Sequence, residues 1–87
     1  MNFDQHIILG VHITERLTKA QEVQYLFSEY GSNIKTRLGL HEVENANSPN
    51  GLVLLEMFGE EARCLELADK LDTIPGIEVQ KMIFNHD

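Results

Sequence analysis

Histidines are the side chains of this sequence that most directly suggest chemistry, because imidazole nitrogens bind transition metals. His6 and His12 lie on the same face of an extended segment, but six residues separate them by roughly 20 Å at about 3.3 Å per residue. Ligands of one ion lie only a few ångströms apart, so this pair cannot hold a metal within one chain. His41 could meet either of them from another subunit, and His86 lies in the terminal tail. We therefore expect solvated histidines and neither a metal nor a cofactor within the chain, with a metal site between subunits as the open alternative.

A carboxylate and a guanidinium form the second candidate site. Glu56 is the single acidic residue in the run 51–59, where a charge needs a partner or water. Arg37, on an expected neighbouring strand, could supply that partner. Glu56 and Arg37 are therefore candidates for a ligand-orienting pair at a subunit interface. The alternative is an ion pair that fixes the register of the strands.

The turn before the first expected helix is a third candidate. Thr14, Glu15 and Arg16 occupy it, and the free N–H groups at a helix amino terminus can anchor a small carboxylate or phosphate. The alternative is a capped helix with solvated charges. Cys64 stands alone on a later helix, without the spacing of a paired metal site, so it is interpreted as core packing rather than as a ligand or nucleophile.

Hydrophobic periodicity predicts the strands that must position these side chains. Apolar and polar residues alternate over 6–13 and 34–43, and 51–59 is an almost continuous apolar run that suits a central strand buried on both faces. Residues 77–84 resume an extended pattern whose change of phase predicts a bulge near Lys81. In the second strand, the residues expected to face the core are Ile34, Thr36, Leu38 and Leu40.

Apolar residues at three- and four-residue spacing predict two amphipathic helices. The first covers 17–30 and is expected to end at Gly31 in a left-handed conformation. The second covers 60–71 and begins with acidic residues that favour a helix amino terminus. Its expected buried stripe is Cys64, Leu67, Ala68 and Leu71.

The order of these elements is βαββαβ, the ferredoxin-like arrangement of the α+β class. It predicts one domain over residues 1–87 with a core from 6 to 84, built as an antiparallel four-stranded sheet with two helices on one face. The other face stays uncovered and apolar, and a patch of that size on a monomer marks an interface. A homo-oligomer, either a dimer or a tetramer, is therefore predicted. The candidate interface residues are Ile8, Gly10, Leu52, Leu54 and Phe58.

Composition excludes several classes of function. The formal net charge is −7 and the seven Lys and Arg are scattered, so the chain lacks the basic surface of a nucleic-acid binder. No apolar segment approaches the roughly 20 residues that cross a bilayer, and the first residues do not resemble a signal peptide. Together with the single cysteine, which fits a reducing compartment, this predicts a cytoplasmic protein with no nucleic-acid or membrane partner.

Nearly the whole chain, residues 6 to 84, resembles the small ACT-like family of iron-only hydrogenase system regulators. The residues that carry the resemblance are Arg16, Val23, Leu26, Phe27, Tyr30, Ile34, the run Arg37-Leu38-Gly39 and the turn Pro75-Gly76-Ile77. The family is similar to ACT domains and to the carboxy-terminal domain of a nickel-responsive repressor, which are oligomeric modules that bind small effectors. The resemblance implies a regulatory oligomer with a small-molecule effector or a protein partner.

Two departures from these cousins limit what is carried over. The turn at Thr14-Glu15-Arg16-Leu17 replaces the Asp-Arg-Pro-Gly-like effector loop typical of ACT domains, and the chain has no separate DNA-binding segment. A small acylphosphatase-like hydrolase is the alternative function, but the phosphate-cradling loop of that class is missing from the first strand and turn. The sequence therefore predicts a non-enzymatic, oligomeric ACT-like regulatory module.

Overall fold

The computed structural model of the protein describes residues 5–14, 16–40 and 51–85. Four strands form one antiparallel sheet in the order β2-β3-β1-β4, and two α-helices pack against it. This is the predicted ferredoxin-like βαββαβ arrangement. The elements are β1 (Gln5–Ile13), α1 (Arg16–Glu29), the 3₁₀ turn η1 (Gly31–Asn33), β2 (Ile34–Leu40), β3 (Gly51–Met57), α2 (Glu61–Asp72) and β4 (Ile77–Asn85).

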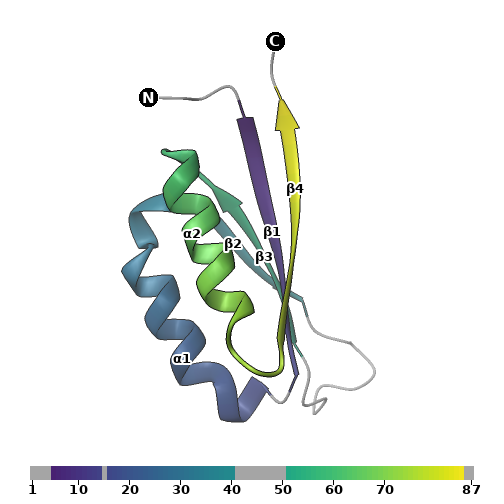
Figure 1. The fold of residues 1–87 in the computed structure, drawn as a ribbon. Coiled ribbons are helices and arrows are strands. Elements are labelled where there is room, and N and C mark those ends of the chain that lie inside the picture. The colour runs from purple at the N-terminus through teal and green to yellow at the C-terminus, as the bar shows by residue number, and fades with distance from the viewer. Residues whose placement is uncertain (1–4, 15, 41–50, 86–87) are drawn as a thin grey trace.

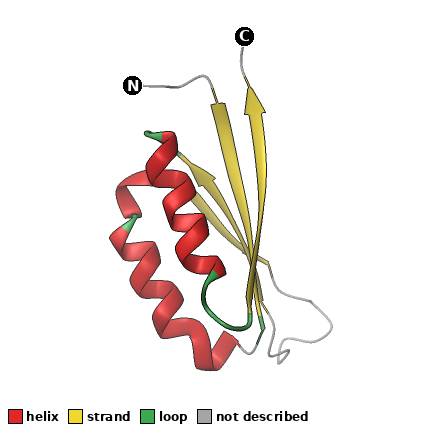
Figure 2. Cartoon of the chain, in the orientation of Figure 1, coloured by secondary structure: helices red, strands yellow, loops and turns green. Residues whose placement is uncertain are grey.

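The molecule has two layers, with both helices on one side of the sheet (Figure 1) and only strands in the second layer (Figure 2). The core lies between the layers. Alternate residues of β1 point into it, which follows from the two-residue period of a strand. The buried side chains from the sheet are Ile7, Leu9, Val11, Ile13, Leu55, Met57 and Ile77, and those from the helices and the residue after α1 are Val23, Phe27, Tyr30, Cys64, Leu67, Ala68 and Leu71. The predicted buried stripe of the second helix is confirmed.

Ile34 packs against the core as predicted, but from Thr36 onward the two faces of β2 are the reverse of the prediction. Ile34 pairs with Met57 and Thr36 pairs with Glu56, so two residues of β2 span one step of β3. This bulge at Lys35 inverts the alternation that follows it. Thr36 and the two leucines after it therefore face away from the helices.

The bulge predicted near Lys81 is absent, because β4 pairs one to one with β1 from Ile77 opposite Ile13 to Asn85 opposite Gln5. The change of apolar phase arises because β4 carries apolar residues on both of its faces. The first apolar residues of β4 face the helices, whereas Met82 and Phe84 face the other side of the sheet.

The turn between β3 and α2 is held by Asn33. Its side-chain Nδ2 donates to the carbonyl of Phe58 at 3.0 Å, and its carbonyl accepts from the Phe58 N–H at 2.8 Å. Gly59 follows with a φ of +93°, in the left-handed region that favours glycine. Gly31, in contrast, lies in η1 and does not have the left-handed conformation predicted for it.

Substituting Gly59 with alanine is expected to lower the free energy of unfolding by about 1 to 3 kcal/mol. A Cβ there would adopt a strained φ and would lie 3.0 Å from Asn33 Nδ2, pushing on the bond to Phe58. Denaturant unfolding of Gly59→Ala measures the loss. The matched control is Gly39→Ala, because a Cβ at Gly39 meets nothing within 4 Å. Equal stability of the two variants would contradict the assignment.

Candidate functional site

The face of the sheet turned away from the helices, here called the open face, is the candidate site. The strand register aligns its side chains in rows that run across β2, β3, β1 and β4. The rows are Leu40, Leu52, His12 and Glu78; Leu38, Leu54, Gly10 and Gln80; Thr36, Glu56, Ile8 and Met82; and, on β1 and β4, His6 and Phe84. No described helix covers this face (Figure 1).

Much of the open face is apolar and reaches solvent. Its apolar side chains are Ile8, Leu38, Leu40, Leu52, Leu54, Met82 and Phe84. Leu38 is 51% exposed and Phe84 is 53% exposed, while Leu52 and Leu54 are half-buried by their neighbours. A contiguous group of this kind is typical of an interaction surface rather than of scattered surface residues.

Four of the five predicted interface residues lie on the open face: Ile8, Gly10, Leu52 and Leu54. Phe58 follows the end of β3 and is 51% exposed. Its backbone is part of the turn between β3 and α2 that Asn33 holds. Its place in an interface stays a prediction. This face could be predicted from the sequence because the order of the elements leaves one side of the four-stranded sheet uncovered. The presence of Leu38 and Leu40 on this face could not be predicted, since the bulge at Lys35 has no sequence signal of its own.

Glu56 is the central carboxylate of the open face, and two neighbours bind it. His6 Nε2 lies 2.8 Å from Oε2, and the Thr36 hydroxyl donates to Oε1 at 2.8 Å. The hydrogen bonds from His6 and then from Thr36 lower the pKa of Glu56 from its ordinary value of 4.5, and burial opposes this in part. The result is an oriented carboxylate among apolar side chains, which suits binding and register rather than proton transfer at neutral pH.

Arg37 is not the partner of Glu56, and the predicted ligand-orienting pair is wrong. The two side chains lie on opposite faces of the sheet, because the bulge at Lys35 turns Arg37 toward the helices. There its guanidinium stands over the Phe27 ring, 4.9 Å from the centroid. A cation over an aromatic face is weakly stabilising at an exposed site.

The predicted anchor at the start of α1 is only partly described. The Thr14 N–H donates to the carbonyl of Gly76 at 2.8 Å, so this turn is tied to the loop before β4. The helix begins at Arg16. Glu15 and the side chain of Arg16 lie outside the described residues, and ligand binding there stays a prediction.

Among the described residues, no group of three or more histidines, cysteines, aspartates or glutamates could hold a metal ion. His41 and His86 lie outside them, so the alternative of a metal site between subunits is not tested. Cys64 is buried, and its thiol donates to the Phe58 carbonyl at 3.7 Å. Burial raises the pKa of Cys64, which keeps the thiol protonated at neutral pH and agrees with its interpretation as core packing.

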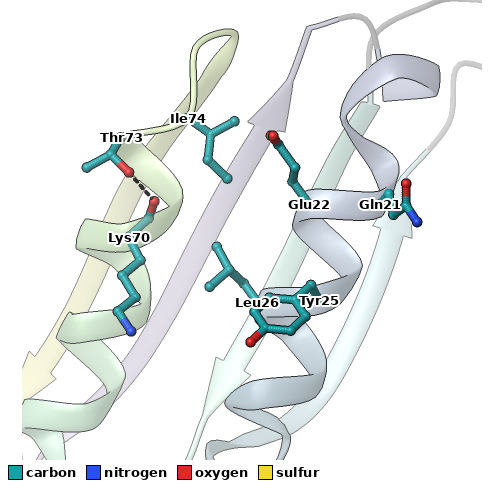
Figure 3. A pocket seen from close by; sticks show the side chains of 7 residues that line it. All are labelled: Gln21, Glu22, Tyr25, Leu26, Lys70, Thr73 and Ile74. Carbon is teal, nitrogen blue, oxygen red and sulfur yellow. Dashed lines mark hydrogen bonds between the residues drawn. The ribbon is translucent and has the colours of Figure 1, made fainter.

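The described residues form a hollow on the open face and a groove between the helices. On the open face, a hollow of about 260 Å³ lies over Gly10, between Leu52 and the side chains of His12, Glu78 and Gln80. A shallower groove of about 570 Å³ separates α1 from α2 on the opposite side of the molecule. Figure 3 shows Tyr25 and Leu26 of α1 facing Lys70 of α2 across it, with Ile74 nearby.

A polar cluster joins the end of α1 to α2, and no sequence pattern predicted it. The fully buried Tyr30 donates its hydroxyl to Glu66, while Arg63 and Lys70 stand 4.3 and 5.3 Å from its ring centroid. Lys70 also pairs with Glu29 at 3.5 Å. The hydrogen bond from Tyr30 is the main cause of the lowered pKa of Glu66. This cluster fixes the helix layer and not the open face.

The lowered pKa of Glu56 gives a pH-dependent expectation. Since the folded-state pKa lies below the unfolded value, the stabilisation is complete above the unfolded value and is lost as the pH falls through the folded one. Replacing His6 with alanine should raise the pKa of Glu56 more than Thr36→Val does, because His6 makes the larger contribution. Carbon-13 NMR titration of the Glu56 carboxyl measures both shifts. A pKa that His6→Ala leaves unchanged would contradict the assigned contact.

The helices of the described structure do not include one that is long and apolar enough to span a membrane. No family model matches the chain, and no curated protein matches it. The fold and the open face therefore define a class by architecture, namely a ferredoxin-like α+β domain with an uncovered apolar sheet face.

Solved structures with the same fold do match. An uncharacterized protein from Thermotoga maritima superposes with a TM-score of 0.79 at 20% identity, over 93% of this chain and 99% of that one. A protein assigned to PII-like signaling from Thermus thermophilus gives a TM-score of 0.59 at 10% identity, over 98% and 90% of the two chains. A formyltetrahydrofolate deformylase from Pseudomonas putida gives 0.53 at 13% identity, over 88% of this chain but 28% of that one. At these identities the likeness establishes the fold alone.

Proposed function

We propose that this protein is a small, non-enzymatic regulatory module that acts as a homo-oligomer, with the open face of its sheet as the contact between copies. The observation that carries the proposal is the apolar open face, where seven apolar side chains across four strands remain partly or largely exposed in one chain. Covering such a face removes apolar area from water, and a symmetric second copy is the commonest cover.

The regulatory part of the proposal has two supports. The chain resembles the ACT-like family in its sequence, and one of its structural neighbours is a protein assigned to PII-like signaling. Neither Glu56 with its two neighbours nor the protonated thiol of Cys64 is arranged as an activated nucleophile. We therefore propose that the module binds a small effector or a protein partner, and that the hydrogenase system named by the family resemblance is the process it regulates.

The test combines oligomeric state with ligand response. The purified chain is expected to run as an oligomer in size-exclusion chromatography with light scattering, and its melting temperature is expected to rise with an amino acid, a nucleotide or another small anion. A monomer whose melting temperature none of these ligands changes would contradict the proposal. Turnover of an acyl phosphate that is lost in Arg16→Ala would instead support the hydrolase alternative.

Involvement in hydrogenase biology has its own readout. Deletion of the encoding gene in a host that makes an iron-only hydrogenase should change the activity of that enzyme in cell extracts, and a plasmid copy should restore it. Unchanged hydrogenase activity would remove this part of the proposal and leave the oligomeric module untouched.

A further inference from the structure

Apolar and polar side chains of the open face lie along different diagonals of the sheet. This arrangement limits how a second copy can pack on the face. One diagonal is apolar, and each step along it moves one strand across and one row along the sheet. Its residues are Leu40, Leu54, Ile8 and Phe84. They form a continuous line of apolar side chains, here called the apolar stripe, from the free corner of β2 to the free corner of β4. Leu38, Leu52 and Met82 flank the stripe directly.

The corners on the opposite diagonal are polar. His12, Glu78 and Gln80 occupy the corner shared by β1 and β4, where Gln80 Nε2 donates to Glu78 Oε2 at 3.0 Å. Thr36 and Glu56 occupy the side toward the start of β2, with His6 bound to Glu56. The face therefore has an apolar diagonal between two polar flanks.

When two identical faces meet about a two-fold axis in the contact plane, residues on the axis meet their own copies. An axis along the strands would place Leu40 opposite Glu78, and an axis across the strands would place Leu54 opposite Glu56. An axis along the polar diagonal would bring Glu56 and Glu78 each against its own copy, which like charges oppose. Each of these three arrangements buries a carboxylate without a matching partner.

The fourth arrangement pairs apolar side chains with apolar side chains along and beside the axis. With the axis along the apolar stripe, Leu52 meets Leu38 of the second copy, and the four stripe residues meet their equivalents. Glu56 then meets Gly10 of the second copy, where the hollow of about 260 Å³ offers room beside the side chains of His12, Gln80 and Glu78. A Cβ at Gly10 would meet nothing closer than 3.8 Å, so packing within one chain does not require this hollow.

We infer that two copies of this chain pack open face against open face about a two-fold axis that runs along the apolar stripe. The inference rests on the proposed homo-oligomer and specifies its contact. With strands about 4.8 Å apart and rows about 6.7 Å apart, the stripe runs at about 35° to the strands, so the strands of the two copies cross at about 70°. This is nearer to orthogonal than to aligned sheet packing.

The size of the face is sufficient for such a contact. Four strands and four rows give a face of about 500 Å², of which about 400 Å² per copy overlaps when the strands cross at about 70°, or about 800 Å² in total before the relief of the side chains is added. Side-chain relief raises this area toward the roughly 1,000 Å² that a biological interface should clear, in the range of weak contacts.

Cross-linking of single cysteines at the corners tests the axis. In a Cys64→Ala background, which removes the buried native thiol, Leu40→Cys and Phe84→Cys each lie on the axis and are expected to form cross-linked dimers with a short bismaleimide. Glu78→Cys is the control, because its two copies lie about 23 Å apart in this arrangement. Circular dichroism of each variant shows that it is folded before it is scored.

The outcomes separate this inference from the proposed function. Cross-links at both Leu40→Cys and Phe84→Cys, without one at Glu78→Cys, are the expected result. A stable dimer that cross-links at Glu78→Cys, or at only one of the two stripe positions as edge-to-edge pairing of β2 or β4 would give, overturns the inference and leaves the oligomeric module standing. A wild-type chain that is monomeric removes both.

Discussion

Leu38→Glu is expected to separate the oligomer into single chains and to raise its dissociation constant by about 100-fold or more. Leu38 is 51% exposed in one chain, so a carboxylate there costs the isolated domain little. The dimer would bury two such carboxylates, one from each copy. Each would lie opposite Leu52 of the other copy, without a cationic partner. Burying an unpaired charge costs several kcal/mol. Sedimentation velocity over a range of protein concentrations measures the change.

Tyr25→Glu is the matched control for Leu38→Glu. Tyr25 is also a large apolar side chain, it is 68% exposed, and it lies on α1 at the groove between the helices. The same charge added there should leave the association unchanged. If Tyr25→Glu dissociates the oligomer and Leu38→Glu does not, the helix layer and not the open face forms the contact.

Tyr30→Ala is expected to lower the free energy of unfolding by about 3 to 5 kcal/mol. The Tyr30 side chain is fully buried, Arg63 and Lys70 stand over its ring, and its hydroxyl binds Glu66. Truncation removes this packing and leaves a cavity beside the Glu66 carboxylate, which keeps its bond from Arg63 and loses the one from Tyr30. Since small domains are stable by about 5 to 15 kcal/mol, the variant should be close to unfolding at 37 °C.

Tyr30→Phe separates the hydroxyl from the ring. It keeps the packing and removes the bond to Glu66, so a loss of about 1 kcal/mol is expected. Urea unfolding at one fixed protein concentration gives both values, because association would otherwise add to the apparent stability. If Tyr30→Ala costs no more than Tyr30→Phe, the ring does not contribute the packing assigned to it.

The fold could be predicted from the sequence because its signals are local and repeat many times. Residues alternate over β1, and Val23, Phe27 and Tyr30 recur at helical spacing, so a single misplaced residue changes neither element. The order of six elements then selects the topology, and with it the existence of an uncovered face. The burial of Cys64 followed from the same periodicity.

The arrangement of side chains on the open face could not be predicted in the same way. The bulge at Lys35 depends on how β2 pairs with β3. A shift of one residue turns every later side chain of the strand to the opposite face of the sheet. The Glu56–Arg37 pair failed for this reason. The contact of Glu56 with His6 depends on the register between β1 and β3, which places residues 50 positions apart within 2.8 Å.

The most direct test of the covered open face is sedimentation equilibrium of the wild-type chain. We expect a mass of at least twice 9.9 kDa at micromolar concentration, reduced to 9.9 kDa by Leu38→Glu. A wild-type mass of 9.9 kDa at all concentrations up to about 100 μM would contradict the proposed contact.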